Sequence, residues 1–290
     1  MIKTKHIDKF KIGQSIYGFY QSIFKEKKIS KNGDPYIDLL LRDTTGQINA
    51  KIWNFSDFYN SAFNEGDLVA VKGEVKRYRS NLFLEIKNIS SLIPDRYRKY
   101  GFNPEDIYPE IEVSTKLIFN KIKKNINLLN SPYKSFLLNI YNHYEYNIKN
   151  FPDDLSIYQY NKRGALILKI YNAIVIAKNI LKKKNNLNKD IIISGILLKY
   201  IGRVKQYNYN IIFKLTKTGA TEDCFILSRD IIKRFSKNKK IDKNIVNDLV
   251  DIVLYNHTSN ESYNQNFNAE IVDLVFQVEK SLFYANKIDC

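Results

Sequence analysis

The spacing of hydrophobic residues changes once along this chain of 290 residues, and that change limits its possible folds more than any other feature. Between residues 15 and 93, apolar and polar residues alternate between turn residues, which predicts a small antiparallel sheet. Beyond residue 114 the apolar residues recur at the spacing of an α-helix. The sequence therefore predicts a multidomain α and β protein: a β domain over 1–94, a charged linker with prolines over 95–113, and an all-α domain over 114–290.

The alternating part predicts five strands, with a short helix at about 55–63 after the third strand. This order is typical of the OB-fold, a small barrel whose exposed face often binds single-stranded nucleic acid. We therefore expect an N-terminal five-stranded OB-fold barrel, with strands over 16–23, 36–42, 48–53, 69–78 and 82–87.

Binding of a single strand requires planar side chains that stack on bases and cations that follow the phosphates. The predicted strands interleave both types on positions expected to face outward: Tyr36, Lys51, Trp53, Lys72, Lys76, Tyr78, Phe83 and Lys87. The alternative is that Trp53 and Phe83 pack on the neighbouring domain and that the lysines are solvated surface charges. The interleaving favours nucleic-acid binding.

In the helical part, Ser114 can cap a first helix, and Ser131 with Pro132 marks the start of a second. The segment 165–181 is apolar almost all round, apart from a polar stripe at Lys169, Asn172 and Asn179, so we expect it to be central. Gly202 is expected to close a helix in the left-handed conformation. Further helices are expected at about 189–201, 228–236, 241–256 and 268–285.

The formal net charge of +16 makes a polyanion the first partner to consider, while the abundance of Lys, Asn, Ile and Tyr is also typical of an AT-rich genome. The two cysteines, Cys224 and Cys290, are too few for a disulfide framework or a thiolate zinc site. The sequence shows neither a signal peptide nor a run long enough for a membrane span. We expect a cytoplasmic protein with no membrane partner.

Two segments of the β domain resemble one protein family in the same order: KNGDPYIDLLLRDTTGQINAKIW (31–53) and EGDLVAVKGEVKRYRSNLFLEIKNI (65–89). In the helical domain, related sequence falls at 130–133, 151–152, 163–164, 195–198, 201–202 and 218–219. Over about 12–285 the chain resembles the YhaM-type 3′ to 5′ exoribonucleases. This resemblance implies an N-terminal OB-fold and a C-terminal HD domain, whose histidine and aspartate side chains hold divalent metal ions.

The chain departs from this family at the expected metal ligands. The family's His-Asp pair falls on Lys199 and Tyr200, and its other ligands fall on Leu168, Cys224, Asn256 and Val278, with Glu279 beside the last. The chain has three histidines in all, and an ammonium such as that of Lys199 has no lone pair for a metal. The resemblance therefore implies a degenerate HD site without catalytic residues or bound metal. Because no cationic or basic partner is visible near Cys224 in the sequence, we expect it to be a small core residue.

We expect a non-catalytic protein that binds single-stranded nucleic acid, RNA before DNA, without a cofactor. In the stretch 190–206, the cations that could contact a phosphate are Lys199, Arg203 and Lys205. One alternative is an active metal-dependent 3′ to 5′ exoribonuclease, its divalent metal held by some of Asp251, Glu270, Asp273 and Glu279. Another alternative is a structural subunit of a larger assembly, with a protein partner or a second copy of the chain.

Overall fold

The computed structural model describes residues 6–103, 106–157, 160–184, 187–210, 212–237, 241–255 and 266–285. The chain divides into two compact units, Met1–Pro109 and Glu110–Cys290, and this boundary falls inside the segment predicted as a linker. Among the described residues, no helix is both long and apolar enough to cross a bilayer.

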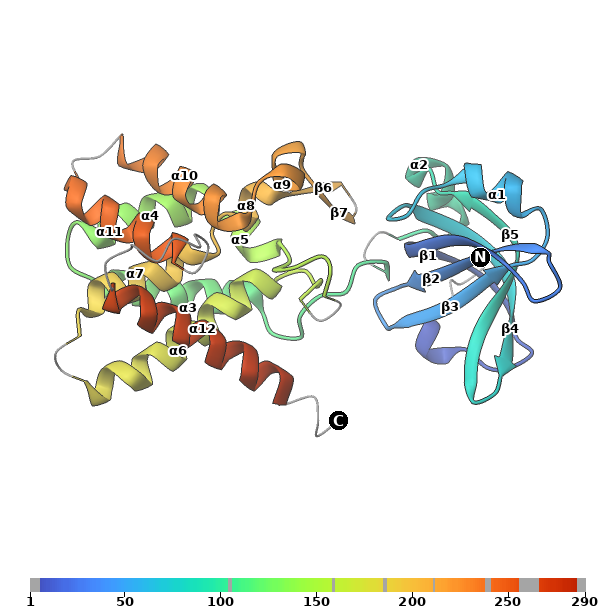
Figure 1. The fold of residues 1–290 in the computed structure, drawn as a ribbon, viewed down its shortest axis with the longest axis horizontal. Helices are drawn as coiled ribbons and strands as arrows, with labels where there is room; N and C mark the ends of the chain where they lie inside the picture. The colour runs from blue at the N-terminus through green and yellow to red at the C-terminus, as the bar shows by residue number, and fades with distance from the viewer. Residues whose placement is uncertain are drawn as a thin grey trace. The chain divides into compact units, whose positions relative to one another are not determined.

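The first unit is a closed five-stranded barrel, which confirms the predicted OB-fold (Figure 1). β1 (Ser15–Ile29) pairs antiparallel with β4 (Leu68–Tyr78) through its first half and with β2 (Pro35–Arg42) through its second half. β2 also pairs with β3 (Gln47–Ile52), and β5 (Asn81–Ser91) lies between β3 and β4. Each strand is therefore paired on both sides.

β1 is longer than the predicted 16–23 because its alternation changes phase in the middle. The register shifts between Ser22 and Phe24, near the residues where the strand leaves β4 and joins β2. Such an irregularity bends the strand and changes which positions face inward. A strict period-two pattern therefore ends there, although the strand continues.

The barrel core consists mainly of the inward residues that the alternation identifies. The buried residues include Ile37, Leu39 and Leu41 of β2, each at most 1% exposed, and Val69, Val71 and Val75 of β4. The helix α1 (Ser56–Ala62) follows β3 as predicted, and Phe63 directly after it joins the core.

Part of the predicted linker packs on the barrel. It contains the short helix α2 (Pro94–Tyr97) and the 3-10 turn η2 (Arg98–Tyr100). The ring of Phe19 in β1 meets the rings of Tyr97 and Phe102 edge-on, with centroids 5.7 and 5.4 Å apart. Residues up to about 102 are therefore held by aromatic contacts within the first unit.

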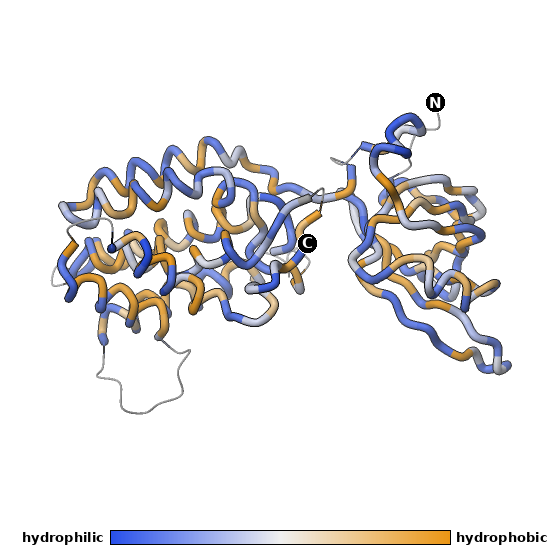
Figure 2. The backbone as a smooth tube through the Cα atoms, turned by 90° about the horizontal axis from the view of Figure 1, so that it is seen from above, coloured by the Kyte–Doolittle hydropathy of each residue, from blue (hydrophilic) through white to orange (hydrophobic). Residues whose placement is uncertain are grey.

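The second unit is predominantly helical, as predicted, and hydrophobic residues alternate with hydrophilic ones along its helical turns (Figure 2). Ser114 caps the first helix as expected, accepting a hydrogen bond from the backbone N–H of Leu117 at 3.4 Å. The helices are α3 (Thr115–Asn127), α4 (Tyr133–His143), α5 (Glu145–Asn150), α6 (Ala165–Lys183), α7 (Lys189–Lys199), α8 (Arg203–Gln206), α9 (Lys217–Thr221), α10 (Cys224–Ser236), α11 (Lys243–Leu254) and α12 (Phe267–Ala285).

The helix α7 forms the centre of this unit. It contacts α4, α6, α10, α11 and α12, and its residues from Ile191 to Lys199 are all buried. The Tyr141 hydroxyl of α4 donates a hydrogen bond to the backbone carbonyl of Leu197 at 2.8 Å. The predicted central helix α6 packs against α7.

Two details of the helical unit differ from the prediction. It contains a hairpin of β6 (Tyr207–Asn210) and β7 (Ile212–Leu215), where aromatic and polar residues alternate over too short a stretch to be recognised. Gly202 has φ −57° instead of a left-handed conformation. A Cβ atom at Gly202 would lie 2.0 Å from the carbonyl oxygen of Cys224, so glycine is needed for the close approach to α10.

Candidate functional site

The outer surface of β2 and β3 carries a pair of aromatic rings with a cation above them. The ring centroids of Tyr36 and Trp53 are 4.7 Å apart with an interplanar angle of 31°, and Trp53 is 39% exposed. The ammonium of Lys51 lies 4.5 Å from the Tyr36 ring centroid and 5.5 Å from that of Trp53. We call these three residues the aromatic platform.

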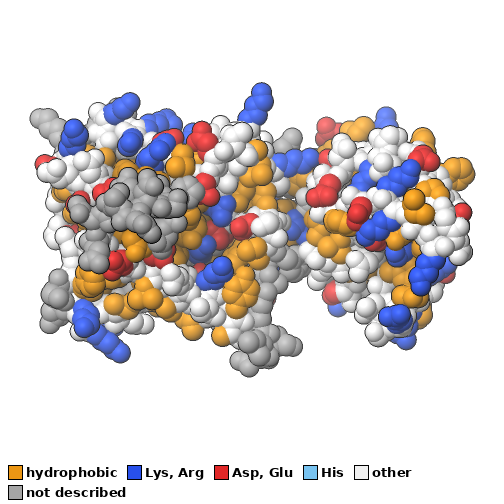
Figure 3. Space-filling view, viewed as in Figure 1, with side chains coloured by type: hydrophobic (Ala, Val, Ile, Leu, Met, Phe, Trp, Pro, Cys, Tyr) orange, Lys and Arg blue, Asp and Glu red, His pale blue; other side chains and the backbone are white. Residues whose placement is uncertain are grey.

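Carboxylates accompany the lysines on this barrel surface. Asp38 pairs with Lys28 at 2.9 Å and with Lys51 at 3.5 Å. Charges of both signs are also mixed on the face of the first unit that is visible in Figure 3. Because these lysines already have counterions, the surface is less basic than the net charge of +16 suggests.

The remaining residues of the predicted face lie on β4 and β5. Lys76 pairs with Glu85, and Lys87 pairs with Glu74 at 3.4 Å. Phe83 is half-buried opposite Lys76, whereas Tyr78 is 67% exposed near the β4–β5 turn. Lys72 is exposed and pairs with no carboxylate among the described residues. The structure thus places the eight predicted residues on the barrel, but in different local settings.

Two exposed aromatic residues beside the platform were missed by the sequence analysis. Phe55 is 77% exposed and has φ 56°, and Phe58 of α1 is 68% exposed. Both line a hollow together with Asp34 and Trp53. A bulky residue with positive φ is uncommon. Because Phe55 precedes a helix and lies outside the alternating strands, only its position two residues after Trp53 could have indicated it.

In the helical unit, Lys199 is a core residue. It is 2% exposed, its ammonium lies 3.5 Å from a carboxylate oxygen of Asp273, and it donates a hydrogen bond to the backbone carbonyl of Tyr255 at 3.3 Å. Burial lowers the pKa of Lys199, and Asp273 opposes that effect. The surroundings of Lys199 are therefore filled, and its ammonium is not offered to a phosphate from solvent.

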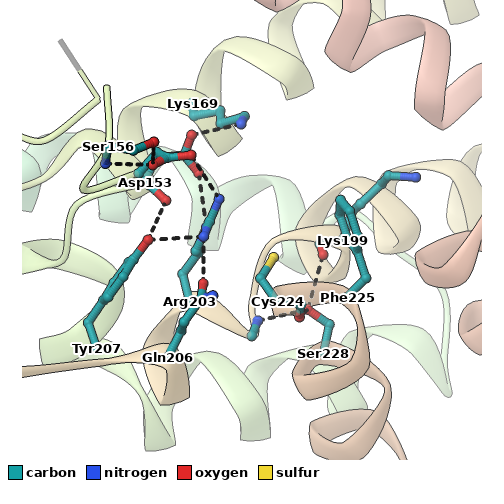
Figure 4. A network of polar contacts seen from close by, with 12 residues as sticks. Asp153, Ser156, Lys169, Lys199, Arg203, Gln206, Tyr207, Cys224, Phe225 and Ser228 are labelled. Atoms are coloured by element: carbon teal, nitrogen blue, oxygen red, sulfur yellow. Dashed lines mark hydrogen bonds and ion pairs between the residues drawn. The ribbon is translucent and has the colours of Figure 1, made fainter. Parts of the chain in front are cut away.

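A second buried cation, which the sequence analysis did not assign to the site, lies at Lys169 of α6. Its ammonium lies 2.7 Å from a carboxylate oxygen of Asp153 (Figure 4). It also lies 3.7 Å from the ring centroid of Tyr200. Burial alone would lower the pKa of Lys169, but the neighbouring Asp153 carboxylate raises it above its ordinary value. Lys169 is therefore protonated at neutral pH and contacts Tyr200, the residue to which the resemblance assigns the family's aspartate position.

Arg203 completes this charge network from α8. Its guanidinium lies 3.7 Å from Asp153 and 3.6 Å from Asp154, and it donates a hydrogen bond to the Tyr207 hydroxyl at 3.0 Å. The side chain of Arg203 is 15% exposed. Like Lys199, Arg203 is already paired with carboxylates, whereas Lys205 of the predicted phosphate contacts is exposed.

Glu279 of α12 faces the same network. It is 3% exposed, and burial raises the pKa of its carboxyl while the Lys169 ammonium lowers it. Within the described residues, the Tyr160 hydroxyl and one carboxyl oxygen of Glu279 are buried without a hydrogen-bond partner. The region around Lys169 therefore contains buried polar atoms that form no hydrogen bond with the described residues.

At the other positions that the resemblance assigns to ligands, the described side chains are apolar, aromatic or a buried thiol. Leu168 and Val278 are half-buried apolar residues, and Tyr200 packs its ring on Phe276 with centroids 4.8 Å apart. Burial raises the pKa of the Cys224 thiol to about 12, so it is protonated at neutral pH, as in the expected core residue. Asn256 lies outside the described residues.

The four acids that could rebuild a metal site do not come together. Asp273 pairs with Lys199, and Glu279 lies near Lys169. Glu270 is half-buried in the first turn of α12, and Asp251 is exposed on α11. Among the described residues, no group of three or more His, Cys, Asp and Glu side chains is arranged to hold a metal ion. Because the polar region also contains the ammonium of Lys169, its residues do not fit a divalent cation.

Comparison with known proteins shows a similarity of the barrel to one family and of most of the chain to one relative. Residues 21–92 match the family described as OB-fold nucleic acid binding domain. The 3′-5′ exoribonuclease YhaM of Shouchella clausii (strain KSM-K16) is 24% identical to this chain over 270 residues, which cover 89% of this chain and 80% of that protein. The resemblance that the sequence motifs indicated is therefore confirmed over most of the chain.

Two solved structures are similar to the barrel. The second OB-fold domain of replication protein A from Methanococcus maripaludis is 25% identical, with a TM-score of 0.26, over 30% of this chain and 93% of that domain. The mitochondrial single-stranded DNA binding protein Rim1 from S. cerevisiae is 21% identical, with a TM-score of 0.23, over 27% of this chain and 91% of that protein.

Proposed function

We propose that this protein binds single-stranded nucleic acid, with RNA as the preferred form, without cutting it. The observation that carries the proposal is the aromatic platform, where Tyr36, Trp53 and Lys51 combine base-stacking surface with a cation. The match of residues 21–92 to an OB-fold nucleic acid binding domain supports the same conclusion. The similarity to an exoribonuclease favours RNA over DNA.

The strand would cross the barrel over β2 and β3, which is the surface that OB-folds generally use. A base stacks on Trp53 or Tyr36, and the neighbouring phosphate forms an ion pair with the ammonium of Lys51. Tyr78, in the exposed β4–β5 hairpin, adds a further stacking surface. Because Lys51 and Lys28 share Asp38, binding would also release Asp38 from these lysines, which reduces the electrostatic gain.

The charges in the helical unit support the part of the proposal that excludes cutting. A nuclease of the related kind needs a metal ion that activates a water molecule. Here Lys169 provides a positive charge beside Tyr200, and an ammonium can neutralise a carboxylate but cannot activate water as a Lewis acid. The protein would therefore keep the helical fold of the related nucleases but would not hydrolyse nucleic acid. We also retain the expectation of a cytoplasmic location, since Cys224 is a free buried thiol.

Both alternatives remain testable against this proposal. A nuclease with a rebuilt carboxylate site would use Asp273 or Glu279, although each of these acids faces a lysine. A structural subunit would have no affinity for single strands, and its lysines would be ordinary surface charges.

Binding to labelled single-stranded RNA at increasing salt concentration tests the proposal. We expect the logarithm of the binding constant to fall linearly with the logarithm of the salt concentration, with a slope of about −0.7 per neutralised phosphate. The four lysines of the face set a limit of about −2.8. Because three of them are already paired with carboxylates, a slope of roughly −1 to −2 is expected. Fluorescence anisotropy measures both quantities. No measurable binding at low salt would contradict the proposal and favour the structural subunit.

A further inference from the structure

The barrel carries a second groove on the side formed by β1, β4 and β5. Its volume is about 510 Å³, within the range of ligand-binding pockets. Its lining includes Tyr17, Phe58, Lys72, Asn88, Ser90 and Tyr97. We call it the rear groove, because it lies away from the β2–β3 surface that carries the aromatic platform.

One row of residues crosses the rear groove from strand to strand. Tyr17 of β1 pairs in register with Lys72 of β4, and Lys72 pairs with Asn88 of β5. Neighbouring strands are about 4.8 Å apart, so these side chains emerge close together on the outer surface. The row therefore presents an aromatic ring, a cation and an amide beside one another on one surface.

The wall of the groove is held in place by other contacts. Tyr97 of α2 packs against Phe19, and its hydroxyl forms a hydrogen bond with the Ser90 hydroxyl at 3.0 Å. Tyr17 is 41% exposed and Phe58 is 68% exposed, so two rings remain open to a ligand. The groove combines a rigid wall with open rings, which lowers the entropy cost of binding.

The positive charge of Lys72 makes the rear groove suited to an anionic ligand. Lys72 is the only charged residue among those that line it in the described part of the chain, and it pairs with no carboxylate there. By contrast, the β2–β3 surface has Asp38 between its lysines. An anion with planar groups is therefore accommodated in the rear groove without competition from an acidic side chain.

The two binding surfaces are continuous around α1. Phe58 lines the rear groove and also the hollow that contains Trp53 and Phe55. A strand that leaves the aromatic platform past Phe55 therefore reaches the rear groove by passing Phe58. This path is built entirely from residues of the first unit.

We propose that the rear groove is a second subsite for the same single strand of nucleic acid, which passes from the aromatic platform around α1 to Tyr17 and Lys72. This inference rests on the proposed function. It predicts a binding site longer than the β2–β3 surface alone provides. Short oligonucleotides fill the platform, and only longer ones also reach the rear groove.

The test compares two lengths of labelled single-stranded RNA, about 5 and about 15 nucleotides, which span the usual site sizes of OB-folds. Tyr17→Ala is expected to weaken binding of the long RNA by at least about fivefold, the loss of one stacked base, and to change binding of the short RNA by less than about twofold. Lys72→Ala is expected to reduce the salt slope for the long RNA alone. Trp53→Ala is expected to weaken both lengths.

Controls keep the outcomes separate. Tyr146→Ala and Lys116→Ala remove an exposed ring and an exposed charge from the helical unit and are expected to leave both affinities unchanged. Circular dichroism verifies the fold of each variant, and the fluorescence of Trp53, the one tryptophan in the chain, adds a second check for the variants that keep it. Equal affinities of Tyr17→Ala and the unaltered protein for the long RNA would overturn the second subsite. The same result is expected if the rear groove binds a peptide instead of RNA. If the unaltered protein binds neither RNA, the proposed function itself fails.

Discussion

Replacement of Lys169 by methionine is expected to lower the free energy of unfolding of the helical unit by about 3 kcal/mol. The variant leaves the Asp153 carboxylate, which is 2% exposed, without the ammonium at 2.7 Å. Removing one partner of a buried ion pair typically costs about 3–5 kcal/mol, because the other charge remains buried. We expect the lower end of this range, since Arg203 still faces Asp153.

Chemical denaturation followed by far-ultraviolet circular dichroism measures this loss, because the helices lie mainly in the second unit. Lys178→Met is the matched control, since Lys178 is an exposed lysine of the same helix. The fluorescence of Trp53 reports on the barrel, which should unfold as in the unaltered protein. The double variant Lys169→Met with Asp153→Asn should recover part of the loss, as expected for coupled residues. A change below about 1 kcal/mol for Lys169→Met would show that the ion pair does not hold this network together.

Replacement of Trp53 by alanine is expected to weaken the binding of single-stranded RNA by roughly 5-fold to 150-fold. This range corresponds to about 1–3 kcal/mol for one stacked base. Trp53 and Tyr36 pack against each other, so the substitution also removes support from the second ring of the platform. Fluorescence anisotropy at fixed salt measures the change in the dissociation constant.

Trp53→Phe is the informative companion variant, because it keeps a planar ring. It should restore most of the affinity if stacking is the cause. Tyr146→Ala, which removes a 59% exposed ring from the helical unit, should have no effect. Unchanged affinity in Trp53→Ala would place the nucleic-acid interface elsewhere, even if the protein binds RNA.

The periodicity of the sequence was sufficient to predict the barrel and most of the helices. The alternation over β2, β3, β4 and β5 assigned the buried positions correctly, because one face of each strand packs in the core. Alternation does not explain Arg42: it follows the inward Leu41 and would therefore face outward, but it is 1% exposed. The Arg42 guanidinium lies 4.7 Å from the ring of Tyr108, a contact across 66 positions of the chain that local alternation does not contain.

The electrostatics of the candidate sites could not be predicted in the same way. The pairing of Lys76 with Glu85 and of Lys51 with Asp38 depends on strand register, which a list of outward residues does not include. The sequence analysis considered Lys199 because it stands at a ligand position of the related family. The cation against Tyr200 is instead Lys169, one residue after Leu168. The polar stripe of Lys169 and Asn172 on an otherwise apolar helix was the available signal, since Asn172 interacts with Glu279.

The central claim is that this protein holds single-stranded RNA without cutting it, and incubation with labelled RNA under binding conditions tests it most directly. The RNA carries its label at the 5′ end, and Mg²⁺ or Mn²⁺ is added at a protein concentration that saturates binding. We predict that the RNA is bound and keeps its full length in both metals and in the presence of a chelator. Metal-dependent shortening from the 3′ end that the chelator stops would contradict the account, and loss of that activity in Asp273→Ala or Glu279→Ala would assign it to a rebuilt carboxylate site.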